Sequence, residues 1–174
     1  MTIVVGAAVA GPALALPSIG SIAFLPEGAP FVYRKRHLHP GEERYVDAGT
    51  RDSACLRHGD DSVALAICAD TGQRAHAAAA AADGASLYLA SSLISDAGYA
   101  RDASALQASA AQCKMGVLLA NHAAPSGGFA SAGRSAFWNP DGDLVAGVDG
   151  PGNRLLIVDK RAGRWSGQVL SLDQ

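Results

Sequence analysis

The sequence predicts an α/β fold, because short apolar runs typical of strands alternate with two alanine-rich stretches typical of helices. The apolar runs are separated by turn residues, chiefly glycine and proline. The chain has 174 residues, of which 49% are hydrophobic and 17% are charged. This length is enough for one packed core and too short for two. We therefore expect a single domain over residues 1–174.

Nine segments are expected to form strands: 2–9, 18–25, 30–36, 62–69, 86–91, 116–121, 135–139, 144–148 and 154–159. The turns PEG at 26–28 and PDG at 140–142 each place a glycine where a hairpin needs a positive φ angle, so each should join antiparallel strands. The apolar stretch 3–16 has no preceding Lys or Arg and is interrupted by glycine and proline. This favours a buried strand and a turn over a cleaved leader.

A helix is expected over residues 71–83, capped by Thr71 and ended by Gly84 in the left-handed conformation. It would link the strand that ends near Cys68 to the strand that begins at Ser86 in a β-α-β crossover, which makes those two strands parallel. A second helix, over about residues 97–112, precedes the strand at 116–121 in the same way.

Charge and composition argue against several classes of partner. The net charge is −2 and the basic residues are scattered, so we expect no nucleic acid. No segment reaches the roughly 20 apolar residues of a membrane span, so we expect no membrane partner. Cys55, Cys68 and Cys113 are widely spaced without a Cys-x-x-Cys clip, which fits neither a zinc site nor a disulfide framework. A reducing cytoplasm is the expected location.

Cys68 is the first candidate for chemistry, because it closes the apolar strand VALAIC at 63–68 and directly precedes a polar turn into a helix. Sites in parallel α/β sheets form at the carboxyl ends of strands, and a helix N-terminus is expected to lower the pKa of a nearby thiol. A buried cysteine with a purely structural role is the competing interpretation. Cys55 and Cys113 lack this context and are expected to be inert.

Lys35 is the second candidate, at the end of a strand within the cationic run YRKRHL at 33–38. A lysine there can present a fixed positive charge to an oxyanion and lower the pKa of a neighbouring thiol. A solvated basic strand end is the alternative. His37 and His39 alternate nearby and could face a shared metal, but no third ligand follows at a recognisable spacing, so exposed or hydrogen-bonded histidines are expected.

Together, the two segments resemble the lysine and nucleophile motifs of the nitrilase superfamily of carbon-nitrogen hydrolases. The lysine motif is matched by YRKRHL at 33–38 with PGE at 40–42, and the nucleophile motif by ICAD at 67–70. Later landmarks follow in the same order: GAS at 84–86, LAN at 119–121, GRS at 133–135 and NPDG at 139–142. The resemblance covers nearly the whole chain, which is similar to the C-terminal two-thirds of a family member.

The resemblance implies an α-β-β-α sandwich of the nitrilase type and a Glu-Lys-Cys triad that needs no metal or organic cofactor. Cys68 would attack an amide, carbamoyl or nitrile carbon, and water would resolve the covalent intermediate. Lys35 and the backbone N–H of Ala69 would stabilise the oxyanion, with Glu42 and Asn121 in supporting roles. His122 is expected near the pocket. Family members associate through helices beside the site, so a homodimer is expected.

The chain departs from the family pattern at the residue that acts as the general base of the triad. The family's general-base glutamate precedes the lysine motif, whereas residues 1–8 resemble the strand that enters the lysine hairpin, so the first β-α units are expected to be missing. Glu27 is the only carboxylate before Lys35, but it lies in a hairpin turn, a strand length away. Ala69 also stands where the family more often has an aromatic residue.

Three hypotheses follow from this departure. The first is a carbon-nitrogen hydrolase whose N-terminal segment lies outside the given sequence. The second is a catalytically inactive fragment or pseudoenzyme that acts as a binding or assembly subunit. The third is a non-catalytic α/β ligand-binding domain, which requires the order of the motifs to be coincidental. The motifs do not distinguish amidase, nitrilase and carbamoylase, because loops form the acyl pocket.

Overall fold

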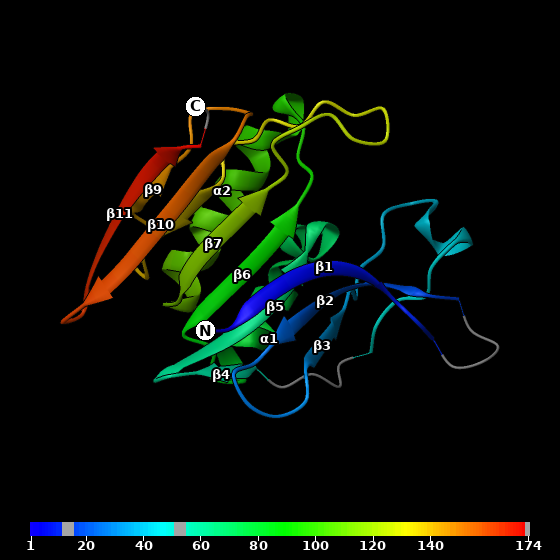
Figure 1. Ribbon diagram of the computed structural model, residues 1–174, viewed down its shortest axis with the longest axis horizontal. Coiled ribbons are helices and arrows are strands. Elements are labelled where there is room, and N and C mark those ends of the chain that lie inside the picture. The colour runs from blue at the N-terminus through cyan, green and yellow to red at the C-terminus, as the bar shows by residue number, and fades with distance from the viewer. Residues whose placement is uncertain (12–15, 51–54, 173–174) are drawn as a thin grey trace.

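The computed structural model describes residues 1–11, 16–50 and 55–172, whose largest element is a six-stranded sheet (Figure 1). Its strands, in spatial order, are β4 (Leu56–His58), β5 (Asp61–Ile67), β6 (Leu87–Ser92), β7 (Gly116–Asn121), β8 (Ala136–Trp138) and β9 (Leu144–Gly147). The three central strands β5, β6 and β7 are parallel, and the remaining pairings are antiparallel. The predicted α/β class is confirmed.

A second, antiparallel sheet and a hairpin complete the strands. The second sheet consists of β1 (Ile3–Val9), β2 (Ser18–Phe24) and β3 (Phe31–Arg34), in that order. The hairpin of β10 (Arg154–Arg161) and β11 (Arg164–Ser171) lies beside β9 (Figure 1). Gly28 and Gly142 have φ angles of 87° and 85°, so both predicted hairpin turns are confirmed.

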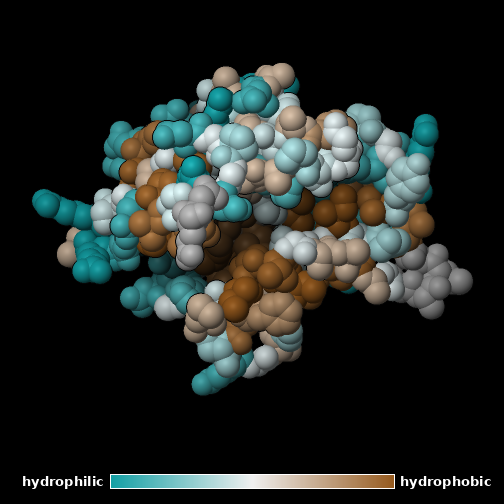
Figure 2. Space-filling model, turned by 45° about the horizontal axis from the view of Figure 1, so that its top comes forward, coloured by the Kyte–Doolittle hydropathy of each residue, from teal (hydrophilic) through white to brown (hydrophobic). Residues whose placement is uncertain are grey.

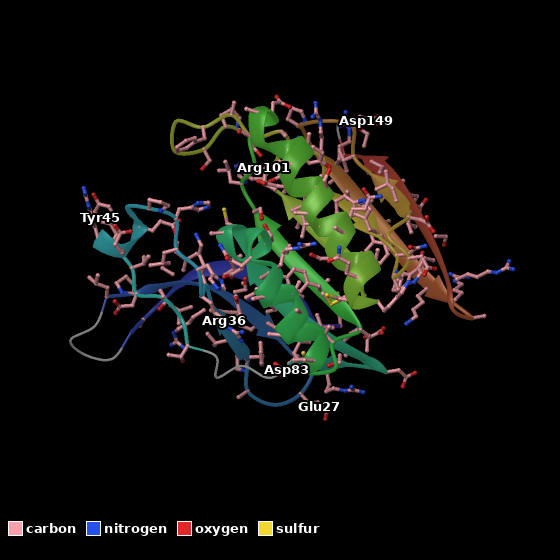
Figure 3. The ribbon with its side chains drawn as sticks, turned by 180° about the vertical axis from the view of Figure 1, so that it is seen from behind. Glu27, Arg36, Tyr45, Asp83, Arg101 and Asp149 are labelled. Carbon is pink, nitrogen blue, oxygen red and sulfur yellow. The ribbon has the colours of Figure 1, made fainter. Side chains whose placement is uncertain are left out.

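Two helices, α1 (Arg74–Ala82) and α2 (Asp96–Cys113), cover one face of the larger sheet (Figure 3). Their inner sides carry alanines such as Ala77 and Ala110, which pack against Tyr88 and Leu119 of the sheet. Small side chains let the helices approach the strands closely, and each fully buried leucine contributes roughly 1.5–3 kcal/mol. This core fixes the β5-α1-β6 crossover, and with it the carboxyl end of β5.

The smaller sheet packs against the other face of the larger one. Ala23 of β2 and Tyr33 of β3 share a second core with Leu56, Val63 and Leu65 of β4 and β5. The described residues therefore form a helix layer and two sheet layers, in agreement with the expected sandwich of the nitrilase type. This packing brings the end of β3, with the lysine motif, beside the end of β5.

Three expectations about elements were wrong or incomplete. The strands β4 and β11 were not predicted, and β4 has only three residues. The helix expected from Thr71 is divided into a 3-10 helix, η2 (Cys68–Gly72), and α1, which begins at Arg74. Thr71 therefore does not cap the helix. Its hydroxyl donates to the carbonyl of Cys68 over 2.7 Å.

The N-terminal strand, expected to be buried, is largely exposed. Large apolar side chains are accessible on β1 and on the β10-β11 hairpin: Ile3, Val4, Val5, Leu155, Val169 and Leu170. Figure 2 shows apolar surface around a hollow on one face of the molecule. This exposed apolar surface lies on strands, and the homodimer stays a prediction. No helix in the described part of the chain is long and apolar enough to cross a bilayer.

Candidate active site

Cys68 directly follows the carboxyl end of β5 and is the first residue of η2. Its φ angle is 46°, in the left-handed region that costs a non-glycine residue roughly 1–2 kcal/mol. Two hydrogen bonds hold the turn: Thr71 Oγ1 donates to the Cys68 carbonyl, and the N–H of Ile67 donates to Asp70 Oδ2 over 3.0 Å. A strained strand-to-helix turn of this kind exposes a side chain at the end of a sheet, as nucleophiles require.

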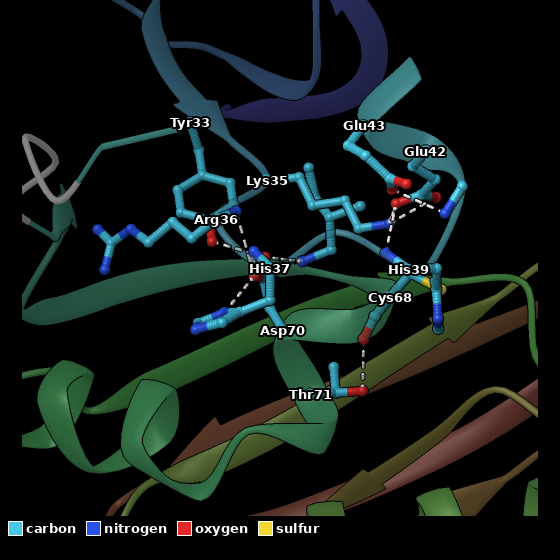
Figure 4. A network of polar contacts seen from close by, with 12 residues as sticks. Tyr33, Lys35, Arg36, His37, His39, Glu42, Glu43, Cys68, Asp70 and Thr71 are labelled. Carbon is cyan, nitrogen blue, oxygen red and sulfur yellow. Dashed lines mark hydrogen bonds and ion pairs between the residues drawn. The ribbon is translucent and has the colours of Figure 1, made fainter. Parts of the chain in front are cut away.

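Lys35 directly follows β3 and is almost completely buried, with 1% of its side chain exposed. Its ammonium donates to both oxygens of Glu42, over 2.8 Å and 2.6 Å (Figure 4). Burial raises the pKa of Glu42, but the hydrogen bonds from Lys35 and from the His39 N–H outweigh this effect and hold it below its usual value. Glu42 therefore holds the buried end of the Lys35 side chain in place.

Cys68, Lys35 and Glu42 line one cavity of about 470 Å³, together with Asn121 and His122. The structure thus brings together residues that lie far apart in the sequence. Glu27 is not among the residues that line this cavity, and Figure 3 places it at the tip of the β2-β3 hairpin. In the described ranges, no group of three or more His, Cys, Asp or Glu side chains is arranged to hold a metal ion.

The expected decrease in the pKa of the Cys68 thiol is wrong. Burial raises this pKa, and the positive charge of Lys35 and hydrogen bonds from the backbone N–H groups of Leu93 and Ala69 only partly compensate. The helix that follows Cys68 is a short 3-10 helix rather than the long α-helix that was expected. The thiol therefore keeps its proton at neutral pH.

Asn121 fixes the loop that follows β6. Its buried Oδ1 accepts a hydrogen bond from the N–H of Ile94 over 2.8 Å, and its Nδ2 donates to the carbonyl of Gly133 over 2.6 Å. This loop carries Leu93, whose N–H points to the thiol of Cys68. Asn121 therefore lies where it can position a hydrogen-bond donor of the site, whereas Leu93 itself has no sequence feature that marks it.

Asp70 is fully buried and organises the turn that carries Cys68. Its carboxylate accepts hydrogen bonds from the hydroxyl of Tyr33, the N–H groups of Ile67, Arg36 and His37, and Nδ1 of His37 (Figure 4). Burial raises the pKa of Asp70, but these donors lower it more, so the carboxylate is charged at neutral pH. Asp70 thus ties the lysine segment to the nucleophile segment.

A chain of hydrogen bonds extends from Asp70 into the core. Burial lowers the pKa of His76 to about 4, so its imidazole is neutral at pH 7. The Tyr33 hydroxyl donates to Asp70, and it must therefore accept from Nε2 of His76 over 2.8 Å. Nδ1 of His76 then accepts from the hydroxyl of Tyr88, also over 2.8 Å. The network therefore assigns one tautomer to His76, with the proton on Nε2. Each polar group of Tyr33, His76 and Tyr88 in this chain has a hydrogen-bond partner.

The stability of the protein is expected to fall by about 3 kcal/mol between pH 6.5 and pH 4 because of His76. The folded pKa lies below that of the unfolded chain, so in this range the unfolded state binds a proton that the folded state does not. Urea unfolding at pH 4, 5, 6 and 7 measures the effect. His76→Gln should show a flatter dependence on pH, whatever its absolute stability, and an unchanged slope would contradict the assignment.

His39 contacts the candidate nucleophile directly. Its Nε2 lies 3.1 Å from Sγ of Cys68, and its backbone N–H donates to Oε2 of Glu42 over 2.8 Å. His37, two residues earlier, instead binds Asp70 over 2.9 Å. These two histidines were expected to be exposed or hydrogen-bonded, and both form hydrogen bonds. Their alternation was visible in the sequence, but which partner each one meets depends on how β3 packs beside β5.

Comparisons with known proteins agree with this fold. The family model of the carbon-nitrogen hydrolases matches residues 2–166. The NitN amidase from Nesterenkonia sp. AN1 is a similar solved structure, with 24% identity and a TM-score of 0.78 over 87% of this chain and 60% of that chain. Another solved amidase from Nesterenkonia sp. has 26% identity and a TM-score of 0.75 over 87% of this chain and 59% of that chain.

A third similar structure is a glutamate-to-glutamine mutant of the Nesterenkonia amidase, with the acetamide moiety of fluoroacetamide added covalently at its active site cysteine. It has 24% identity and a TM-score of 0.78 over 87% of this chain and 58% of that chain. The chain spans about 60% of the length of the solved amidases that it matches. The search of curated proteins found no match. The match to the family model covers most of the sequence, and this chain belongs to the carbon-nitrogen hydrolase family.

Proposed function

We propose that the chain carries the nucleophile and the oxyanion-stabilising lysine of an amide hydrolase, with Cys68 and Lys35 in these roles. The observation that carries the proposal is the shared cavity in which a thiol on a strained turn faces a buried, carboxylate-bound lysine. Two further donors, the N–H groups of Ala69 and Leu93, point to the same sulfur. Membership of the family supports this assignment.

The proposed reaction begins with attack of Cys68 Sγ on the carbonyl carbon of the amide. As the C–S bond forms, the carbonyl electrons move to oxygen, where Lys35 and a backbone N–H stabilise the negative charge. Loss of the amine leaves a thioester, and attack by water releases the carboxylic acid and restores the thiol. Glu42 keeps Lys35 oriented and charged throughout. These residues would form the Lys and Cys part of a Glu-Lys-Cys triad.

The proposed substrates are small amides, in line with the solved amidases of similar fold. The cavity of about 470 Å³ that contains Lys35 is within the range of small-molecule sites. Ser92 lines this cavity, and its buried hydroxyl has no hydrogen-bond partner among the described residues. A bound substrate can supply the missing partner, which makes Ser92 a candidate contact for the amide or its acyl group.

Mass spectrometry of the intact chain tests the proposal. With fluoroacetamide and with a panel of short aliphatic amides, we expect an adduct on the peptide that contains Cys68 and release of ammonia from those amides that turn over. Cys68→Ala should give neither, while Cys113→Ala should behave as the unchanged chain. If no amide reacts although iodoacetamide still labels Cys68, the hydrolase proposal fails, and the inactive binding or assembly subunit becomes the better reading.

A further inference from the structure

Two cavities meet at Cys68, and different side chains line them. The cavity of about 470 Å³ contains Lys35 and Glu42, the ion pair beside the sulfur. The second cavity, of about 450 Å³, is lined in part by apolar side chains from several separate segments of the chain: Leu38, Pro40, Ala69, Leu93, Ile94 and Phe129. A substrate bonded to the sulfur can therefore place its amide group in one cavity and an apolar group in the other.

The direction of attack assigns the acyl chain to the second cavity. When the sulfur of Cys68 bonds to the carbonyl carbon, the oxygen, the nitrogen and the acyl chain extend from that carbon in three different directions. The oxygen has to face Lys35, which lines the cavity of about 470 Å³ together with the unpaired hydroxyl of Ser92 among the described residues. The acyl chain is the substituent that is stabilised by apolar contacts, so it belongs in the cavity of about 450 Å³.

The wall of the second cavity is held in place at Ile94. The N–H of Ile94 donates to Oδ1 of Asn121 over 2.8 Å, and its carbonyl accepts from Nδ2 of Asn121 over 3.2 Å. The same carbonyl also accepts from the hydroxyl of Ser131 over 3.2 Å and from the N–H of Ala132 over 2.8 Å. A wall that is fixed before binding loses little entropy when a ligand binds, so it can discriminate acyl chains by their size. Phe129 is 65% exposed, and an acyl chain in this cavity would cover it.

Gly98 leaves space in this wall. It lies in the first turn of α2 and lines the cavity, although glycine stabilises a helix less than alanine does. A β-carbon at this position would lie 3.5 Å from Cγ2 of Ile94, 3.7 Å from Oδ2 of Asp102 and 3.9 Å from Nη2 of Arg101, which are ordinary contacts. These three neighbours also line the cavity. Packing therefore does not require a glycine here, and its missing side chain makes the cavity larger.

We propose that the cavity of about 450 Å³ is the acyl subsite of the amide hydrolysis described above and that Gly98 sets its depth, so that extended, uncharged aliphatic acyl chains are preferred. This inference rests on the proposed function. The acyl chain extends from Cys68 along Ile94, and its end reaches Gly98. Arg101 and Asp102 form an ion pair over 2.7 Å, and 81% of the Arg101 side chain is exposed (Figure 3). Their charges largely cancel, so this end of the cavity attracts neither an anionic nor a cationic acyl group.

The value of kcat/KM for straight-chain amides from acetamide to hexanamide tests the subsite. In the unchanged chain it should rise roughly 3-fold with each added methylene, because each one is removed from water in the transition state. In Gly98→Leu the ratio of kcat/KM for hexanamide to that for acetamide should fall at least about 10-fold, since the leucine occupies the end of the subsite. Ala105→Leu adds the same side chain at an exposed position of the same helix and should keep the ratio.

Two further measurements accompany this series. The thermal midpoint of Gly98→Leu should be at least that of the unchanged chain, because leucine has the higher helix propensity, so a lower ratio reports on the cavity rather than on the fold. Glutaric acid monoamide carries a carboxylate at the end of a chain as long as that of pentanamide. It should react at least about 10-fold more slowly than pentanamide, because the apolar wall does not solvate the charge. A preference for the carboxylate would overturn the assignment to uncharged chains.

Reversible addition of alkyl aldehydes to Cys68 separates this inference from the proposed function. The sulfur bonds to the aldehyde carbon and the thiol proton moves to the aldehyde oxygen, so the alkyl chain takes the place of the acyl chain without any hydrolysis. Hexanal should protect Cys68 from iodoacetamide at a concentration at least about 10-fold lower than acetaldehyde does, and Gly98→Leu should remove most of this difference.

The combined results distinguish the two proposals. If amides are hydrolysed, but neither the amides nor the aldehydes show a preference for chain length that depends on Gly98, the inference is wrong and the proposed function stands. If no amide reacts, but protection by hexanal depends on Gly98, the subsite exists and the proposed function fails.

Discussion

Lys35→Met is expected to lower kcat for amide hydrolysis by about 10²–10³-fold, with a smaller effect on KM. The full positive charge of Lys35 faces the cavity of Cys68, where the carbonyl oxygen becomes negative only as the sulfur attacks. Removing the lysine therefore raises the free energy of the transition state more than that of the bound substrate. The lysine also lowers the pKa of the thiol, so alkylation of Cys68 at pH 7 should slow as well.

Steady-state kinetics and iodoacetamide labelling of the same preparations measure both effects. Glu42→Gln is the matched control, since it keeps an oxygen acceptor for Lys35 and leaves the cation in the cavity. Its kcat should fall less than that of Lys35→Met. If Lys35→Met kept nearly full kcat, Lys35 would have no role in the reaction. The thermal midpoint of each variant shows whether the fold is kept.

Asp70→Asn is expected to destabilise the protein by about 3–5 kcal/mol, because it removes a fully buried charge from its donors. The carboxylate accepts from the Tyr33 hydroxyl, the Ile67 N–H and several groups of residues 36–37. An amide offers one oxygen in place of two, and its N–H₂ group faces groups that themselves donate. At least one buried donor is left without a partner.

Urea unfolding at pH 7 measures this loss. Asp60→Asn provides the control, since Asp60 is exposed in the turn before β5 and should change the free energy of unfolding by less than about 0.5 kcal/mol. A loss below about 1 kcal/mol in Asp70→Asn would show that the network does not depend on the charge. Where the variant remains folded, slower alkylation of Cys68 would further support a role of Asp70 in holding the turn.

Much of the fold was predictable because local signals and the overall topology agree. The β5-α1-β6 crossover follows from an apolar strand, an alanine-rich helix and Gly84, whose φ angle of 85° confirms the expected left-handed end. The hairpin at Gly142 was equally clear. The strand at 154–159 was predicted, but its hairpin partner β11 was missed, because the turn between them places Ala162 at a φ angle of 48°, a conformation that alanine does not signal.

The residues of the candidate site could be predicted from the sequence, but the contacts between them could not. Cys68, Lys35 and Glu42 stand in recognisable motifs, and the structure places them around one cavity. The pKa of the thiol was predicted in the wrong direction, because the sequence does not reveal how much of Cys68 is buried. Leu93 could not be found from the sequence either, since its contribution is a backbone N–H, which every residue except proline has.

Tertiary packing also decided what the buried polar residues do. His76 lies on an alanine-rich helix and gives no local signal, yet between Tyr33 and Tyr88 it becomes a neutral link in a hydrogen-bonded chain. The sequence by itself determined the α/β class, the family and the order of the motifs, because these depend on residue type and periodicity. Only the packing of β3 beside β5 decided that His39 meets Cys68 and that His37 meets Asp70, because such contacts depend on distances between segments about 30 residues apart.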